Sequence, residues 1–356
     1  MELCLECGVP DVICRGFEWS GGGSIVNRSS GKEYVFLDCR LLTAVYDTLT
    51  FLDGPRAGLI MCEVRRRTVK EEAVRSLGFL ARHSRIWFVR RRALSGLRDL
   101  AVCCGYGNFR IRSYEPSGRA VLEVAHPYFL PFVDAELRAY WEAVEGEQPW
   151  VKMEAQGGTA VFQLENPESK EKDRKSRVLH ERFRPEERPS SGKFERTTCT
   201  SCGAPIEISR FTWNLAAGTV YDPTREAHVC LISVASMEAI IQELKKHYGK
   251  EVEDVMARTA RKYMRGLVRG NMIMRNLGKQ EFLRSLVTRG EVYIVGAKER
   301  PRTVEIEIRN PWSAALVAGE IAGWMEEKER VRMAVEWDME GEAGTIRLKP
   351  ADAITG

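Results

Sequence analysis

The stretch Cys4-Leu-Glu-Cys7-Gly-Val-Pro10 near the N-terminus returns as Cys199-Thr-Ser-Cys202-Gly-Ala-Pro205 past the middle of the chain. Behind each copy the same landmarks follow in the same order: an aromatic-x-Trp segment, an apolar triplet and an x-Pro-aromatic turn. In the first copy these are Phe17-Glu-Trp19, Val35-Phe-Leu37 and His126-Pro127-Tyr128; in the second they are Phe211-Thr-Trp213, Val229-Cys-Leu231 and Asn310-Pro311-Trp312. Recurrence of this kind is typical of a repeated structural unit. The pattern predicts a tandem duplication of one domain.

The overall composition is that of an ordinary soluble globular protein. Hydrophobic residues make up 44% of the 356 residues and charged residues 29%, close to the average. The net charge of +4 is a small difference between 54 basic and 50 acidic residues, so nucleic acid is not an expected partner. The first residues lack the pattern of a secretory signal, and no uncharged apolar run is long enough for a membrane span. We therefore expect a cytoplasmic protein.

The duplication also sets the expected domain boundaries. Repeat one is predicted over residues 1–164 and repeat two over residues 198–350, with a tail at 351–356. Residues 165–197 combine dense mixed charge, several prolines and almost no apolar side chains. Such a segment cannot bury enough apolar surface to offset its ordering entropy. We expect a flexible linker there.

Each repeat predicts the same order of elements: three short strands, two helices, two strands, a helix and two closing strands. In repeat one the strands are expected at 12–19, 23–27, 33–38, 108–114, 120–125, 150–153 and 159–164, and the helices at 41–52, 64–82 and 132–144. In repeat two the strands are expected at 206–213, 218–222, 228–232, 291–297, 304–309, 333–338 and 345–348, and the helices at 237–247, 252–268 and 316–327. Hairpin signals between the strands exclude an all-parallel sheet. The predicted class is α+β: two tandem copies of a domain with an antiparallel sheet and packed helices, each preceded by a CxxCG knuckle.

The cysteine knuckles predict a metal site. In a CxxCG turn both sulfurs point to one centre, and the glycine permits the tight backbone that this requires. Zinc binds four such ligands in a closed tetrahedron, and Cys4, Cys7, Cys199 and Cys202 provide four, one pair from each repeat. We expect one structural zinc that links the two repeats.

Other interpretations of the knuckles stay open at this point. A rubredoxin-like iron centre uses the same ligands, so iron is not excluded. Ligands from another chain, or reduced thiols without metal, are the simpler alternatives. A redox CxxC usually opens a helix, where the helix dipole lowers the thiol pKa; here each CxxC is followed by Gly-x-Pro and an expected strand, which disfavours redox chemistry.

Aromatic residues recur at equivalent positions of the two repeats. Such residues are most often part of the core, and in this chain they are also the candidate lining of a ligand pocket. The candidates are Trp19, Tyr128, Tyr140, Trp213, Trp312 and Trp324. On the last helix Ala135 and Ala139 match Gly319 and Gly323, a stripe of small residues that predicts close packing of that helix.

The sequence contains other features of a kind that can form sites. The five histidines, His83, His126, His180, His228 and His247, form no HxH or HxxxH pair; a haem ligand at His83 is the remote alternative to an ordinary histidine. The pair Cys103-Cys104 has no counterpart in repeat two. The runs Arg65–Arg67 and Arg90–Arg92 are commonly solvated helix faces, and the alternative is a basic face for phosphate, nucleic acid or an acidic protein partner. There is no Walker loop, no GxGxxG and no nucleophile elbow, so no catalytic residue is assigned.

The last third of each repeat resembles a known family. Gly105-Tyr-Gly107 followed by two strands and His126-Pro127, and Asn310-Pro-Trp followed by Leu316-Val-Ala-Gly319-Glu-Ile-Ala-Gly323-Trp, resemble the small-molecule-binding domain of bacteriochlorophyll 4-vinyl reductase and its relatives. The resemblance implies an α+β fold shared with haem-nitric-oxide-binding domains and a hydrophobic cavity between helices and sheet. Relatives often carry a metal-binding cysteine pair in the terminal hairpin, which residues 151–164 and 332–348 lack.

Together these observations predict a ligand-binding or sensory protein without catalytic activity, with a structural zinc and an apolar small molecule as ligand. An enzyme or accessory factor of tetrapyrrole metabolism is the alternative that the resemblance implies. A scaffold that docks a protein through the arginine-rich helices of repeat one is the second alternative.

Overall fold

The computed structural model describes residues 2–83, 96, 98–116, 118–167 and 197–351. The elements of repeat one are α1 (Asp11–Gly16), β1 (Phe17–Trp19), β2 (Ile25–Asn27), β3 (Glu33–Asp38), α2 (Cys39–Asp53), α3 (Pro55–His83), β4 (Asn108–Tyr114), β5 (Arg119–Ala125), α5 (Leu130–Glu145), β6 (Trp150–Gln156) and β7 (Thr159–Glu165). Those of repeat two are the 3-10 turn η1 (Ile208–Arg210), β8 (Thr212–Asn214), β9 (Thr219–Asp222), β10 (Ala227–Ser233), α6 (Val234–Tyr248), α7 (Glu251–Gly270), α8 (Met272–Asn276), α9 (Lys279–Thr288), β11 (Tyr293–Arg300), β12 (Thr303–Arg309), α10 (Ala314–Glu329), β13 (Met333–Glu340) and β14 (Ala343–Pro350). The predicted α+β class, with antiparallel sheets in repeated units, is confirmed.

The segments directly after the knuckles differ from the prediction. Strands were expected from Val12 and from Ile206, but the chain first makes a helical turn, α1 in repeat one and η1 in repeat two. The carbonyl of Pro10 accepts the N–H groups of Ile13 and Cys14 at 2.9 and 3.0 Å, which closes the turn. The turn buries Ile13 completely, so apolar burial is achieved here without a strand.

Both repeats contribute to one central sheet. Its order is β1-β2-β3-β10-β9-β8, and β3 pairs antiparallel with β10 so that Phe36 lies opposite Leu231 and Leu37 opposite Cys230. Since Val35–Leu37 and Val229–Leu231 are equivalent in the two repeats, this pair lies on a pseudo-twofold axis. The repeats are therefore joined by a continuous hydrogen-bonded sheet.

Alternate residues of the two central strands face two different cores. Leu37 and Ile232 belong to the large core formed with the helices, whereas Phe36 and Leu231 belong to a smaller core beneath the knuckles. Successive side chains of a strand point to opposite faces, and both faces are covered here. That is why β3 and β10 are almost continuously apolar.

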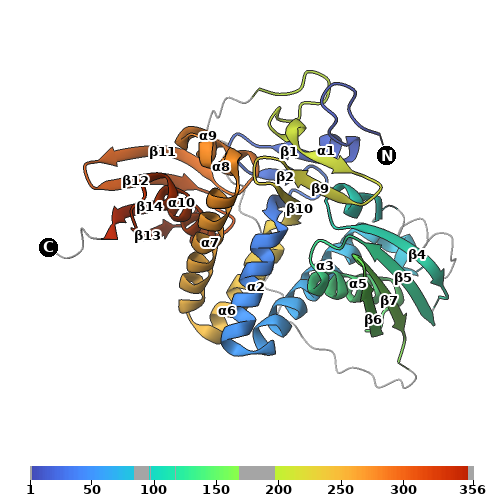
Figure 1. The fold of residues 1–356 in the computed structure, drawn as a ribbon. Helices are drawn as coiled ribbons and strands as arrows, with labels where there is room; N and C mark the ends of the chain where they lie inside the picture. Colours follow the sequence, from blue (N-terminus) through green and yellow to red (C-terminus); the bar gives the residue numbers. More distant parts are fainter. Residues whose placement is uncertain (1, 84–95, 97, 117, 168–196, 352–356) are drawn as a thin grey trace.

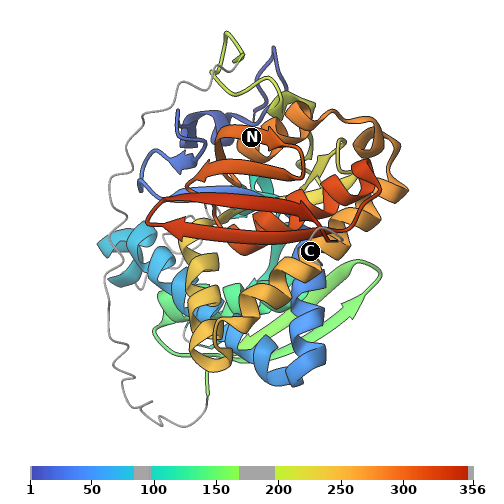
Figure 2. The ribbon, with the colours of Figure 1, turned by 90° about the vertical axis from the view of Figure 1, so that its left-hand side faces the viewer.

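Each repeat also forms a wing of four strands and a helix (Figure 1). The strand orders, β4-β5-β7-β6 and β11-β12-β14-β13, are the same. In the chain, α5 connects β5 to β6 and α10 connects β12 to β13. At the equivalent turns before these helices, His126 and Asn310 adopt φ values of 52° and 49°. Figure 2 views the molecule from the side of the repeat-two wing, with its orange and red strands in front.

Helices of the two repeats pack against each other between the wings. Within each repeat α3 packs on α5 and α7 packs on α10, while α2 packs across on α7 and α6 across on α3. One large core holds residues of both repeats, so the repeats are interlocked. The expected linker, 165–197, lies almost wholly outside the described residues, as does nearly all of the 351–356 tail.

Among the residues that the structure describes, none of the helices has both the length and the apolar character that crossing a membrane requires.

Candidate metal centre and ligand cavity

The two CxxCG knuckles adopt the same backbone loop. The N–H of Gly8 donates to the carbonyl of Cys4 at 2.8 Å, and the N–H of Gly203 donates to the carbonyl of Cys199 at 2.9 Å. The two glycines have φ values of 71° and 74°, a region that glycine adopts without steric cost. Each loop therefore needs its glycine to turn both sulfurs to the same side.

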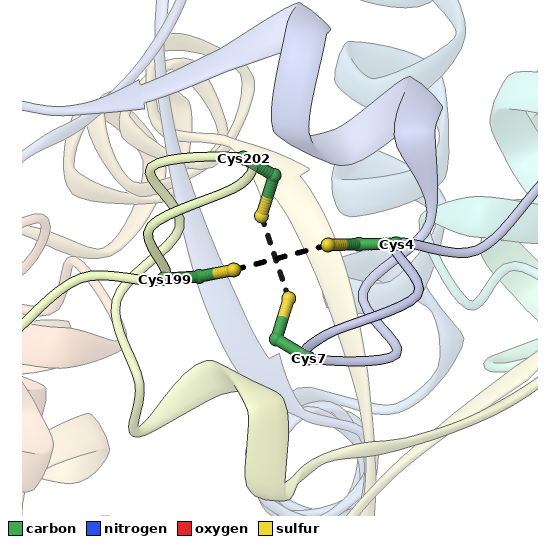
Figure 3. A group of neighbouring side chains, drawn as sticks. All are labelled: Cys4, Cys7, Cys199 and Cys202. Carbon is green, nitrogen blue, oxygen red and sulfur yellow. Dashed lines mark hydrogen bonds between the residues drawn. The ribbon is translucent and has the colours of Figure 1, made fainter.

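The four knuckle sulfurs converge on one point between the repeats (Figure 3). The Sγ atoms of Cys4 and Cys199 are 3.8 Å apart, those of Cys7 and Cys202 are 3.4 Å apart, and all four lie within 4.8 Å of one another. A zinc ion with bonds of about 2.3 Å to four sulfurs needs S–S separations of about 3.8 Å. The donor set and its spacing fit a closed tetrahedral metal site, which four deprotonated thiols of this chain would hold.

The protonation of the thiols is uneven. The backbone N–H of Cys7, followed by that of Glu6, lowers the pKa of Cys4 to about 7, because both stabilise its thiolate. Burial instead raises the pKa values of Cys7 and Cys199. Since metals bind thiolates, loading the site releases protons.

A glutamate fastens the two knuckles together. The Oε2 atom of Glu6 accepts hydrogen bonds from the hydroxyls of Thr200 and Ser201 at 2.8 and 2.6 Å and from the N–H of Ser201 at 3.1 Å. The hydrogen bonds from Ser201, followed by those from Thr200, lower the pKa of Glu6 to about 2. The knuckles thus contact each other beyond their cysteines.

A separate cavity of about 430 Å³ lies in the wing of repeat one, between α5 and the sheet. Its apolar walls are Phe109, Ile111, Tyr114, Ala120, Leu122, Leu137, Tyr140, Trp141, Val144 and Leu164. Arg98, Ala101, Tyr106, Arg110 and Glu136 complete the described lining. The volume is in the range of small-molecule sites, and the lining is mostly aromatic and aliphatic.

The deepest polar group of the cavity is Glu136 on α5, which is only 2% exposed. Its Oε1 accepts hydrogen bonds from Nε of Arg65 at 2.9 Å, from Nη2 of Arg65 at 2.5 Å and from the hydroxyl of Tyr128 at 2.6 Å. Arg65 is equally buried and also donates to Ser236 of repeat two at 2.9 Å. The charge of the carboxylate is therefore neutralised inside the protein.

Repeat two carries an acid at the same place but different surroundings. Arg66–Glu142 and Arg261–Glu326 are equivalent ion pairs, and the residue before each arginine is Arg65 in repeat one but Ala260 in repeat two. The counterpart of Glu136 is Glu320, which pairs instead with Arg225 at 2.8 Å.

Without a large side chain at Ala260, the repeat-two helices approach closely. A Cβ atom added to Gly319 would collide with the carbonyl oxygen of Ala257, and one added to Gly323 with that of Arg261. The predicted close packing of the last helix is thus observed for α10. On α10, Trp324 stacks on Phe282 of α9, with ring centroids 4.7 Å apart and planes inclined by 2°. Its repeat-one counterpart, Tyr140, borders the cavity instead.

The six aromatic residues predicted as pocket lining do not share one cavity. Tyr140 lines the repeat-one cavity, and Trp312 lines a small core cavity of about 20 Å³. Tyr128 holds Glu136, and the indole N–H groups of Trp19 and Trp213 donate to the carbonyls of Thr288 and Cys103 at 3.0 and 3.2 Å. A ligand-binding role for these residues stays a prediction.

The arginine run of α3 is engaged within the protein. Arg65 is buried, and Arg66 and Arg67 pair with Glu63 at 2.6 and 2.9 Å. Arg90–Arg92 lie outside the described residues. Arg65, Arg66 and Arg67 therefore have acidic partners on the same helix and on α5, and a docking role for the arginine-rich helices stays a prediction.

The remaining candidate residues gain no chemical role. Cys103 and Cys104 are buried, and burial raises the pKa of Cys103 to about 11, which disfavours a reactive thiolate. His83 ends α3, and His180 lies outside the described residues. His247 lies 3.7 Å from Glu243 on its own helix.

Sequence reasoning missed the pair of Arg65 and Glu136. The available signal was that Glu136 and Glu320 recur at one position of an otherwise apolar helix face, and buried charges of this kind require partners. The partners themselves are visible only in the fold. The partner of Glu136 is Arg65 on α3, and the partner of Glu320 is Arg225 in the loop between β9 and β10.

Comparisons with known proteins give little further guidance. No family model matches the chain, and no curated protein matches it. Two solved structures that resemble part of it are a Cs H-NOX mutant with 4-cyano-L-phenylalanine at site 5 and a structure on the function of heme distortion in the H-NOX family. Both are 14% identical to this chain, with TM-scores of 0.27 and 0.25. The matched region spans 34% of this chain and 74% and 73% of the two H-NOX chains, respectively. H-NOX is the fold group that the sequence resemblance implied, but likeness at this level identifies neither a family nor a ligand.

Proposed function

We propose that the protein binds an apolar small molecule in the wing of repeat one and acts as a ligand-binding or sensory protein. Repeat two serves as the structural partner, and a zinc ion at the four knuckle cysteines links the two. The observation that carries the proposal is the cavity of about 430 Å³ beside the buried Glu136.

The difference between the wings supports this division of roles. The same helix face that borders the cavity in repeat one is covered in repeat two by the stacked pair Phe282 and Trp324. Open space in a core costs stability. A cavity kept in one copy and filled in the other is typical of a site that is retained for a ligand.

The geometry of the knuckles supports a structural metal. Four protein sulfurs complete the coordination of zinc, whereas catalytic zinc sites keep a position for water or substrate. The site also joins the first residues of the two repeats, Cys4 and Cys199, above the central strand pair. A metal there fixes the relative position of the repeats and leaves ligand binding to the cavity.

Native mass spectrometry of protein purified without chelator tests both parts. We expect one zinc per chain and an additional organic mass. Ala120→Phe, which fills the cavity from β5, should remove the organic mass; Val304→Phe at the equivalent position of β12 should leave it. A wild-type mass equal to that of the metal-loaded polypeptide, together with no uptake of apolar compounds, would exclude the ligand-binding function.

A further inference from the structure

The cavity of repeat one offers a hydrogen-bond acceptor at its inner end. Oε1 of Glu136 accepts three hydrogen bonds, whereas no hydrogen bond to Oε2 is found among the described residues, and Glu136 borders the cavity. A carboxylate oxygen that faces an apolar cavity is stabilised by a hydrogen-bond donor. A ligand that enters the cavity can supply that donor in place of water.

The charge balance restricts what that donor can be. Arg65 already neutralises Glu136, and both side chains are 2% exposed. A cationic ligand would bring a second positive charge into an apolar space without a counter-charge, and a carboxylate ligand would face Oε2 with like charge. Arg98 and Arg110 on the described lining also disfavour a cation. A neutral donor avoids both costs.

The hydroxyl of Tyr140 adds a second polar contact in the same space. Burial, and next the charge of Glu136, raise the pKa of Tyr140, so its hydroxyl stays protonated. It can accept from or donate to a ligand in the cavity. Most of the remaining described lining is apolar, apart from Tyr106, Tyr114 and the two arginines, Arg98 and Arg110.

Building on the proposed ligand-binding function, we propose that this cavity selects a neutral, largely apolar molecule that carries an N–H or O–H donor, which binds Oε2 of Glu136. The donor fixes the orientation of the ligand, and the aromatic walls supply most of the affinity. Glu136 is therefore the residue that distinguishes this ligand class from a plain hydrocarbon of the same size.

Indole and 1-methylindole make a matched pair of probes, because the methyl group removes the only donor and leaves the aromatic body. Isothermal titration of the full-length, metal-loaded protein should show indole binding about 10- to 100-fold more tightly, as expected for a hydrogen bond to a charged group. Ala120→Phe should abolish binding of both compounds.

Two variants then assign the preference to Glu136. Glu136→Gln should reduce the ratio of the two affinities toward one, whereas Glu320→Gln, the equivalent change in repeat two, should leave it unchanged. Should Glu136→Gln fail to fold, the double variant Arg65→Met, Glu136→Leu removes the pair together, a replacement that buried ion pairs often tolerate. It should bind both probes equally.

The outcomes separate this inference from the function on which it rests. Equal binding of the two probes by the wild type, lost in Ala120→Phe, overturns donor selection and leaves ligand binding in place. A preference for indole that survives in the double variant also overturns it. Binding of neither probe up to the solubility limit overturns the inference, and with no organic mass in native spectra it overturns the ligand-binding function as well.

Discussion

The contact between α7 and α10 predicts that a glycine-to-alanine change will destabilise the protein even though alanine is the better helix former. Gly319 lies on α10 where an added Cβ would collide with the carbonyl oxygen of Ala257 and would lie 3.0 Å from the Cβ of Ala260. A backbone oxygen cannot rotate away, so the two helices must separate. Overpacking of this kind costs roughly 1–3 kcal/mol, while helix propensity returns at most about 1 kcal/mol. We expect Gly319→Ala to lower the free energy of unfolding by about 1–2 kcal/mol.

Urea denaturation, followed by far-ultraviolet circular dichroism, measures this difference against a control on the same helix pair. Gly266 lies on α7 with no atom within 4 Å of its added Cβ, so Gly266→Ala should stabilise the protein by up to about 1 kcal/mol. The two substitutions are chemically identical and should act with opposite sign. A Gly319→Ala variant as stable as wild type, or more stable, would refute the close approach of these helices.

Three further outcomes follow from the knuckles and from repeat two. Cys199→Ser should abolish bound metal, as measured by elemental analysis, while Cys103→Ser should retain one ion per chain. The hydrogen bonds that lower the pKa of Glu6 from 4.5 to about 2 contribute stability that is fully present above pH 4.5 and lost as the pH falls toward 2; Glu6→Gln should lack this acid-sensitive part in a pH series of denaturation curves. Burial raises the pKa of Glu320 from 4.5 to about 7, so the folded state binds more protons than the unfolded state in this window and stability falls as the pH rises through it. Glu320→Gln should flatten that fall, and an unchanged slope between pH 5 and pH 8 would contradict the assignment.

Most helices and strands could be predicted from the repeated sequence pattern, because the pattern reflects local and periodic features. Residues 33–38 were predicted as a strand and form β3, and 41–52 were predicted as a helix and lie within α2. These segments have strong strand and helix patterns that their burial in the structure matches. Some element ends moved by a few residues, as at β11, which begins at Tyr293 and not at Glu291, but the helix predicted from residue 64 begins at Pro55 as α3.

The helical turn of α1 and helix α9 were not predicted. The turn is closed locally by the carbonyl of Pro10, whereas α9 makes a long-range contact, the stacking of Phe282 on Trp324. The pairing of β3 with β10 cannot be read from either strand alone, because both are apolar on both faces. The convergence of the four cysteines was expected from the duplication. The cavity was not, because it depends on how residues that differ between the repeats, such as Tyr140 and Trp324, are packed in the folded protein.

The central pairing of β3 with β10 has a consequence for each repeat on its own. A repeat separated from the other would expose the edge of its central strand. It would also expose the helices that pack against the other repeat, and unpaired strand edges readily associate. A polypeptide with one repeat would therefore be expected to form a twofold-symmetric homodimer in which two identical chains replace the two halves of this one. Joining them in one chain removes the requirement that both halves be the same, so one half can keep a cavity beside Tyr140 where the other places the stacked pair of Phe282 and Trp324.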